Sequence, residues 1–232
     1  MSLIHHYQSP NFDERPNHQC LDLIIIHYTG MEKVKEALTR LCDPLAKVSA
    51  HYLIDQKGQC YQLVDDQKRA WHAGVSYWQG IRDINGISLG IELDNGGHDG
   101  GLPFFPESQI QALVSLLISL SQKYHINKKK IIGHSDVAPL RKMDPGELFP
   151  WLTLHQYGFG LWPASTSQQA VPQSIFEVQK ILRIIGYDCP LNGIIDHQTE
   201  AVIRAFQRHF TPNEITGTLT SQLKDTLSCF ET

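Results

Sequence analysis

The segment LDLIIIHYT, residues 21–29, decides the fold, because it is an unbroken apolar run rich in β-branched side chains. Such a run is typical of a strand buried on both faces at the centre of a sheet. It ends near a histidine, His27, where the chain leaves the apolar interior. Taken alone, a histidine in that place is most simply a hydrogen-bonded residue at a strand end.

The segments that follow this strand alternate between strand-like and helix-like patterns. In chain order, we expect a helix over 33–41, two strands within 50–64, a strand over 87–94, a helix over 106–125 and a strand over 129–134. This order predicts an α/β fold with a mixed central β-sheet flanked by helices.

A change of composition marks the last quarter of the chain. The stretch GFGLWPASTSQQAVPQS, residues 158–174, is rich in Gly, Ser, Gln and Pro, which indicates a linker. Three short amphipathic helices are expected after it, the second with Asp196 as its N-cap. The sequence therefore predicts a first domain over 1–163, a linker over 164–173 and a small three-helix domain over 174–232.

Composition excludes several classes of protein. The 232 residues are 41% hydrophobic and 19% charged, which is ordinary for a globular protein. A formal net charge of -4 gives no support for a nucleic-acid partner or an anionic membrane. The five cysteines are scattered without a CxxC pair, which favours reduced thiols over a disulfide framework.

The N-terminal sequence, MSLIHHYQSPNFDERPNH, lacks a basic region followed by an apolar one, so no secretory signal is expected. The most apolar helical stretch, IQALVSLLISL, is about half the length that a bilayer span needs. We therefore expect a cytoplasmic protein without membrane insertion, or a periplasmic or envelope-associated one if a signal segment has been removed. The oligomeric state is left open.

A second stretch, IIGHSDVAPLRKMDPG at 131–146, crowds titratable side chains into a loop shaped by Pro and Gly. His134 follows an apolar strand, as His27 does, and Asp144 lies ten residues beyond it. Two imidazoles and a carboxylate can form a facial set of ligands. With one open position for water, such a set suits a catalytic Zn²⁺.

A catalytic zinc needs a base and a group that stabilises an oxyanion nearby. Glu92 is an acid inside the apolar strand SLGIELDN, where burial is costly unless it has a partner or a task. The alternative interpretation is that Glu92 is exposed at the edge of a strand. Lys142 precedes Asp144 by two residues, so in an extended segment the two side chains leave the backbone in the same direction. Its ammonium could stabilise developing negative charge.

These residues carry a family resemblance. The matching motifs are IIIHYTG, SAHYLID, AWHAG, NGISLGIELDN and GHSDVAPLRKMDPG, in this order over nearly all of residues 20–152. They resemble the zinc-dependent N-acetylmuramoyl-L-alanine amidases of the Amidase_2 class and the peptidoglycan recognition proteins that share their fold. The resemblance implies zinc bound by His27, His134 and Asp144, with Glu92 as catalytic acid/base and Lys142 assisting.

Five further positions in these motifs are expected near the substrate. His51 and His72 are interpreted as residues that support the ligands or line the cleft, because three ligands already complete a catalytic zinc site. Trp71 could offer a flat apolar wall, although a core tryptophan fits its pattern equally well. Ala73 adjoins them in AWHAG, and Asn85 is similar to a substrate-contacting asparagine of the family.

The C-terminal segments VQKILRIIGYD and NGIIDHQTEAVIRAFQ resemble the three-helix peptidoglycan-binding domain. Two interpretations follow. The domain either raises the effective concentration of substrate at the cleft, or it packs on the enzyme and stabilises or dimerises it.

The expected function is zinc-assisted hydrolysis of the amide between N-acetylmuramic acid and L-alanine, in peptidoglycan or in muropeptides, during cell-wall turnover. Two alternatives stay open: a peptidoglycan-binding protein without catalysis, and a zinc peptidase that cuts within the stem peptide. A purely structural metal conflicts with having only three strong protein ligands.

Overall fold

The computed structural model describes residues 3–16, 20–163 and 170–230. The strands are β1 (Leu3–Ile4), β2 (Phe12–Glu14), β3 (Leu23–Tyr28), β4 (Tyr52–Ile54), β5 (Cys60–Gln62), β6 (Lys68–Ala70), β7 (Ser88–Leu93) and β8 (Ile131–Gly133). The helices are α1 (Val34–Cys42), α2 (Ile84–Ile87), α3 (Glu107–Tyr124), α4 (His134–Val137), α5 (Trp151–Gln156), α6 (Ile175–Ile185), α7 (His197–Phe210) and α8 (Ser221–Leu227).

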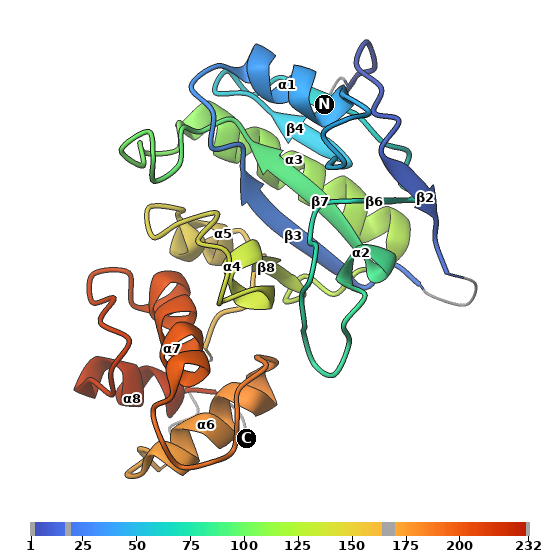
Figure 1. Ribbon diagram of the computed structural model, residues 1–232. Helices are drawn as coiled ribbons and strands as arrows, with labels where there is room; N and C mark the ends of the chain where they lie inside the picture. The colour runs from blue at the N-terminus through green and yellow to red at the C-terminus, as the bar shows by residue number, and fades with distance from the viewer. Residues whose placement is uncertain (1–2, 17–19, 164–169, 231–232) are drawn as a thin grey trace.

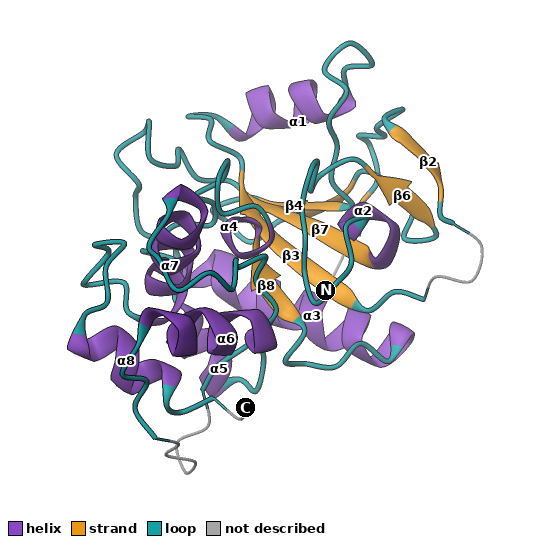
Figure 2. Ribbon diagram, turned by 60° about the horizontal axis from the view of Figure 1, so that its bottom comes forward, coloured by secondary structure: helices purple, strands orange, loops and turns teal. Residues whose placement is uncertain are grey.

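A six-stranded mixed sheet forms the centre of the molecule, in the order β1-β5-β4-β7-β3-β8. Strand β3 pairs in parallel with both β7 and β8, whereas β4 and β5 are antiparallel. Helix α1 lies over one face of the sheet and α3 over the other (Figures 1 and 2). Strands β2 and β6 form a separate antiparallel pair. The predicted mixed sheet flanked by helices is confirmed.

The pleat of β3 divides its residues between two cores. Ile24 and Ile26 pack into the cluster that contains the apolar face of α3. Leu23 and Ile25 belong to the cluster on the opposite face. Because side chains alternate along a strand, His27 points to the same face as Leu23 and Ile25, away from α3.

The strands and helices expected from periodicity are present, with ends shifted by a few residues. One assignment changes: β8 ends at Gly133, and His134 is the first residue of α4 rather than the last of a strand. Short elements with too few residues for a periodic signal were missed, among them β1, β2, β6, α2 and α5. Of the predicted linker 164–173, residues 164–169 lie outside the described residues.

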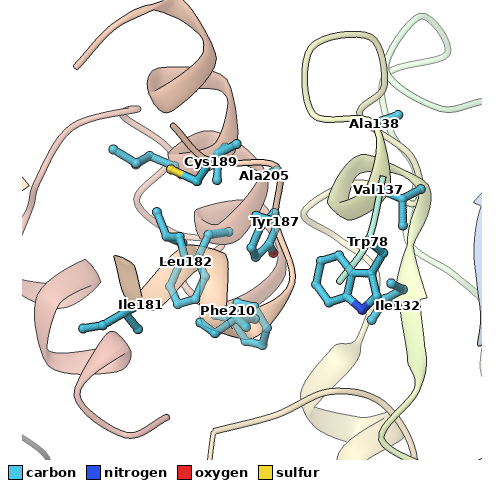
Figure 3. Packing of buried hydrophobic residues seen from close by; sticks show 14 of the residues in the cluster. Trp78, Ile132, Val137, Ala138, Ile181, Leu182, Tyr187, Cys189, Ala205 and Phe210 are labelled. Atoms are coloured by element: carbon cyan, nitrogen blue, oxygen red, sulfur yellow. The ribbon is translucent and has the colours of Figure 1, made fainter. Parts of the chain in front are cut away.

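Helices α6, α7 and α8 gather on the side of the molecule where α4 and β8 lie (Figure 1). They share one apolar cluster with the first part of the chain. Trp78 packs edge-on against Tyr187, with ring centroids 5.0 Å apart, and this contact bridges the two parts (Figure 3). A Cβ at Gly186 would lie 2.5 Å from the Trp78 ring, so a glycine is required there. The C-terminal helices therefore pack on the first part of the chain.

Within the described ranges, no helix combines the length and the apolar character that crossing a bilayer requires.

Candidate active site

Strand register brings the candidate residues together. In the parallel pair of β3 and β7, His27 is aligned with Glu92, so both side chains stand on the same face of the sheet. Strand β8 lies on the other side of β3 and delivers His134 directly after its last residue. The loop that follows returns to this turn, where the Ser135 N–H donates to the Asp144 carbonyl at 2.8 Å.

Three ligand atoms meet at the end of these strands. The Nδ1 atoms of His27 and His134 are 2.9 Å apart, and each lies 3.0 Å from Oδ2 of Asp144. All three residues are buried, with 2%, 2% and 6% of their surface exposed. Such a triangle of two nitrogens and one oxygen is compatible with the short bonds of a transition-metal site.

The donor chemistry of this triangle fits a cation. His134 Nε2 lies 3.0 Å from the Ala73 carbonyl, which can only accept, so Nε2 carries a proton there, and Nδ1 presents a lone pair whenever the ring holds only that one proton. Asp144 Oδ2 contributes lone pairs to the same point. Lone pairs that converge without protons repel one another, and a bound metal ion removes that repulsion.

The protonation states also suit a metal. Burial, and then the neighbouring His134, lower the pKa of His27 to about 4. Burial alone would raise the pKa of Asp144, but His134 and His27 outweigh it and hold that pKa well below its ordinary value. Near neutral pH the metal-free site therefore offers a neutral His27 and an ionised carboxylate, the forms that bind metals.

The pKa of Glu92 is shifted in the opposite direction to that of Asp144. Burial and the Asp144 carboxylate raise its pKa well above the ordinary value, and the Lys142 ammonium opposes this only in part. Its Oε2 atom is buried and has no hydrogen-bond partner within the described residues. A carboxyl group with a raised pKa and a vacant oxygen can take up and return a proton at neutral pH.

These groups line one cavity of about 380 Å³, a size typical of small-molecule sites. His27, His134, Asp144, Glu92 and Lys142 all contribute to its walls. Helix α1 forms another part of the wall with three side chains, namely Ala37, Arg40 and Leu41. The structure therefore gathers all five residues that the sequence assigned to metal binding and catalysis.

The five residues expected near the substrate lie in two different environments. His72 does line the cavity, and its Nδ1 is 3.1 Å from Nε2 of His27. Burial lowers the pKa of His72 well below its ordinary value. Trp71, in contrast, is not among the lining residues and is partly exposed elsewhere.

His51, Ala73 and Asn85 do not contribute to the wall of this cavity, and their expected place near the substrate stays a prediction. His51 is fully buried; its Nδ1 accepts from the Gly90 N–H at 3.0 Å, and its Nε2 lies 3.1 Å from the Lys68 carbonyl and 2.9 Å from the Arg15 guanidinium. Asn85 accepts from the N–H groups of His72 and Ala73 at 3.1 and 2.8 Å. Their polar atoms hold the strands and the AWHAG loop in place.

Arg141 is exposed, and its guanidinium also contacts this site. Its guanidinium donates to the carbonyls of Ala73 and Val75 at 2.9 and 2.6 Å, and it lines the cavity. Arg40 was missed altogether, because an arginine in the last turn of a surface helix carries no signal of its own in the sequence. Together they place two cationic side chains beside the candidate metal centre.

Comparisons with known proteins agree with this geometry. Residues 15–147 match the family described as N-acetylmuramoyl-L-alanine amidase, and residues 172–227 match a putative peptidoglycan binding domain. The chain belongs to the N-acetylmuramoyl-L-alanine amidase family. It is 36% identical over 217 residues to N-acetylmuramoyl-L-alanine amidase AmiD of Escherichia coli, covering 85% of this chain and 77% of AmiD.

Two further relatives extend the comparison. This amidase is 36% identical over 162 residues to 1,6-anhydro-N-acetylmuramyl-L-alanine amidase AmpD of Haemophilus influenzae, covering 62% of this chain and 86% of AmpD. A solved complex of Escherichia coli AmiD with anhydro-N-acetylmuramic acid-L-Ala-D-gamma-Glu-L-Lys superposes with a TM-score of 0.81. It is 32% identical and covers 94% of this chain and 91% of that chain. The enzyme class and the C-terminal resemblance predicted from the motifs are confirmed.

Proposed function

We propose that this amidase hydrolyses the amide between N-acetylmuramic acid and L-alanine of muropeptides, with Zn²⁺ held by His27, His134 and Asp144. One observation carries the proposal. The three ligand atoms form a triangle of 2.9–3.0 Å sides in the same cavity as the unpartnered carboxyl oxygen of Glu92.

In this proposal Glu92 moves the protons. Zinc, when bound, supplies the Lewis acidity that activates water and polarises the amide. The Glu92 carboxylate takes a proton from the attacking water and returns it to the leaving amine of L-alanine. Lys142 places an ammonium at the cavity wall, where it stabilises the negative charge that develops on the carbonyl oxygen.

The relatives support a muropeptide with an anhydro sugar as the substrate. AmpD is named for the 1,6-anhydro form, and the AmiD complex contains an anhydro-N-acetylmuramic acid peptide. Arg40 and Arg141 at the cavity wall suit the carboxylates that such a peptide carries. The substrate contacts of Trp71 and the cytoplasmic location stay predictions.

Metal removal tests the proposal. Purified protein spanning residues 1–232 is loaded with zinc or treated with a chelator, and is then given an anhydro-N-acetylmuramoyl peptide or whole sacculi. We expect mass spectrometry to find intact peptides that begin with L-alanine, released only by the zinc-loaded protein. Activity should return when zinc is restored to the treated sample.

Other outcomes would contradict the proposed reaction, substrate or metal. Shortened peptides would indicate a zinc peptidase that acts within the stem. Release from sacculi but not from the soluble peptide would contradict the choice of substrate while leaving the amidase chemistry intact. Full activity after complete metal removal would refute the metal mechanism.

A further inference from the structure

His72 lies between the candidate ligand His27 and a buried serine of β7. Its Nδ1 is 3.1 Å from Nε2 of His27, and its Nε2 is 3.2 Å from Oγ of Ser88. The Ser88 hydroxyl in turn donates to the Ile84 carbonyl at 2.6 Å. These four residues form a continuous hydrogen-bonded chain that leads from the backbone of α2 to the metal-facing ring.

The Ile84 carbonyl, at the end of this chain farthest from His27, determines the direction of each hydrogen bond in it. A carbonyl oxygen has no proton to give, so the Ser88 proton is committed to Ile84 and Oγ can only accept from His72. His72 Nε2 therefore carries a proton. His72 is 6% exposed and contacts no carboxylate among the residues that the structure describes, so its ring is neutral and Nδ1 is an acceptor. His27 must then donate from Nε2, which leaves its Nδ1 with a free lone pair.

The strand itself provides the space for this ring. A Cβ at Gly90 of β7 would lie only 2.4 Å from Cγ of His72. Since glycine alone avoids that contact, the sequence SLGIEL places a gap in the sheet surface between Ser88 and Glu92. The imidazole lies in this gap, within reach of both hydrogen-bond partners.

We propose that His72 and Ser88 are positioning residues that hold His27 in the tautomer whose Nδ1 faces the metal. The inference rests on the proposed function, because it assumes that zinc binds this triangle. His134 obtains the same tautomer from a single contact with the Ala73 carbonyl. His27 has no carbonyl within reach in the described hydrogen bonds, so a relay through two side chains replaces it.

Zinc binding to variants of the chain of residues 1–232 tests the relay. His72→Phe keeps the ring and removes the acceptor, and His72→Asn can restore an acceptor near the position of Nδ1. We expect His72→Phe to weaken zinc affinity by roughly 10–100-fold, measured by competition with a chromogenic chelator, and His72→Asn to recover part of it. Substrate is not needed for this measurement.

Ser88→Ala keeps the test decisive even where His72→Phe folds poorly. It should weaken zinc binding measurably, by up to about tenfold, because His72 then loses the contact that fixes its own tautomer. The matched control is Ser121→Ala: Ser121 is also buried, but its hydroxyl has no partner within the described part of the chain. This control should bind zinc as the parent protein does.

The tautomer can be observed directly. With ¹⁵N-labelled histidine, the zinc-loaded protein should show His27 protonated at Nε2, and Ser88→Ala should alter the His72 signals. A His27 proton on Nδ1, or unchanged zinc affinity in both folded variants, would overturn the relay. Failure of the parent protein to bind zinc would instead refute the proposed function, so the two outcomes are distinguishable.

Discussion

The carboxyl group of Glu92 has a higher pKa in the folded protein than a glutamate has in water. Its strand neighbours Ile91 and Leu93 are buried on the α3 side, while the carboxyl group faces the cavity beside the ligands. Burial and the charge of Asp144 favour the neutral acid. Glu92 is therefore the proposed acid/base, and its ionised form is unfavourable in the metal-free protein.

Replacing Glu92 with Gln should abolish turnover and spare the metal. We expect kcat to fall by about 10²–10⁴-fold, because the amide has the shape of the carboxyl group but cannot accept and return the proton. Zinc stoichiometry, measured by atomic absorption, should equal that of the parent protein. Near-normal activity would remove Glu92 from its proposed role.

The raised pKa of Glu92 also predicts a pH effect on stability. Between the ordinary pKa of the unfolded chain and the raised pKa of the folded one, the native state holds an extra proton, so the free energy of unfolding falls as pH rises through this window. Metal-free Glu92→Gln should therefore be more stable than the metal-free parent at neutral pH. The two should converge near pH 4, as urea titrations at several pH values can check.

At the scale of elements, the pleat of the parallel strands β3 and β7 organises the site. Residues two apart share a face, so Ser88, Gly90 and Glu92 all point away from α3. Ser88 forms a hydrogen bond with His72, Gly90 leaves space for the His72 ring, and Glu92 places its carboxyl group at the cavity. The strand is thus apolar on one face and functional on the other.

Gly90→Ala tests this arrangement. The new Cβ would force the His72 ring to move, because it would lie within 2.4–2.7 Å of three ring atoms. We expect about 1–3 kcal/mol of destabilisation by urea unfolding, together with weaker zinc binding. Gly96→Ala is the milder comparison, since its new Cβ would lie 3.3 Å from the nearest atom, Cα of Gly100, and not 2.4 Å from a ring. Equal effects of the two substitutions would contradict a specific role for Gly90.

At the scale of the whole molecule, the C-terminal helices hold the turn that carries a metal-binding candidate. Asp136 follows His134 in α4 and is 1% exposed. It accepts from the Tyr187 hydroxyl at 2.6 Å and the Gly133 N–H at 2.8 Å, and it lies 2.8 Å from Nδ1 of His209. These contacts join the C-terminal helices to α4.

Tyr187→Phe should weaken this junction. Removing the hydroxyl leaves one oxygen of a buried carboxylate without its partner, which costs about 1.5–3 kcal/mol for a hydrogen bond to a charged group. Urea unfolding of the full chain measures the loss. Tyr157→Phe, at a position 54% exposed, should change little. An unaltered midpoint in Tyr187→Phe would show that the domain does not brace α4 through this contact.

The sequence by itself determined the sheet, its main helices and the five residues of the candidate metal and catalytic site. Strand and helix periodicity are local, and the amidase motifs carry their functional residues in order, so both can be read along the chain. His27 and Glu92 could be named because each interrupts an apolar pattern.

Only the tertiary structure decided how these residues act. The Nδ1 atoms of His27 and His134 meet across 107 positions of sequence, and Tyr187 reaches Asp136 across 51. Tautomers, the raised pKa of Glu92 and the docking of α6–α8 all depend on distances of a few ångströms between such segments. Hydrogen bonds and desolvation act through space, so no local pattern encodes them.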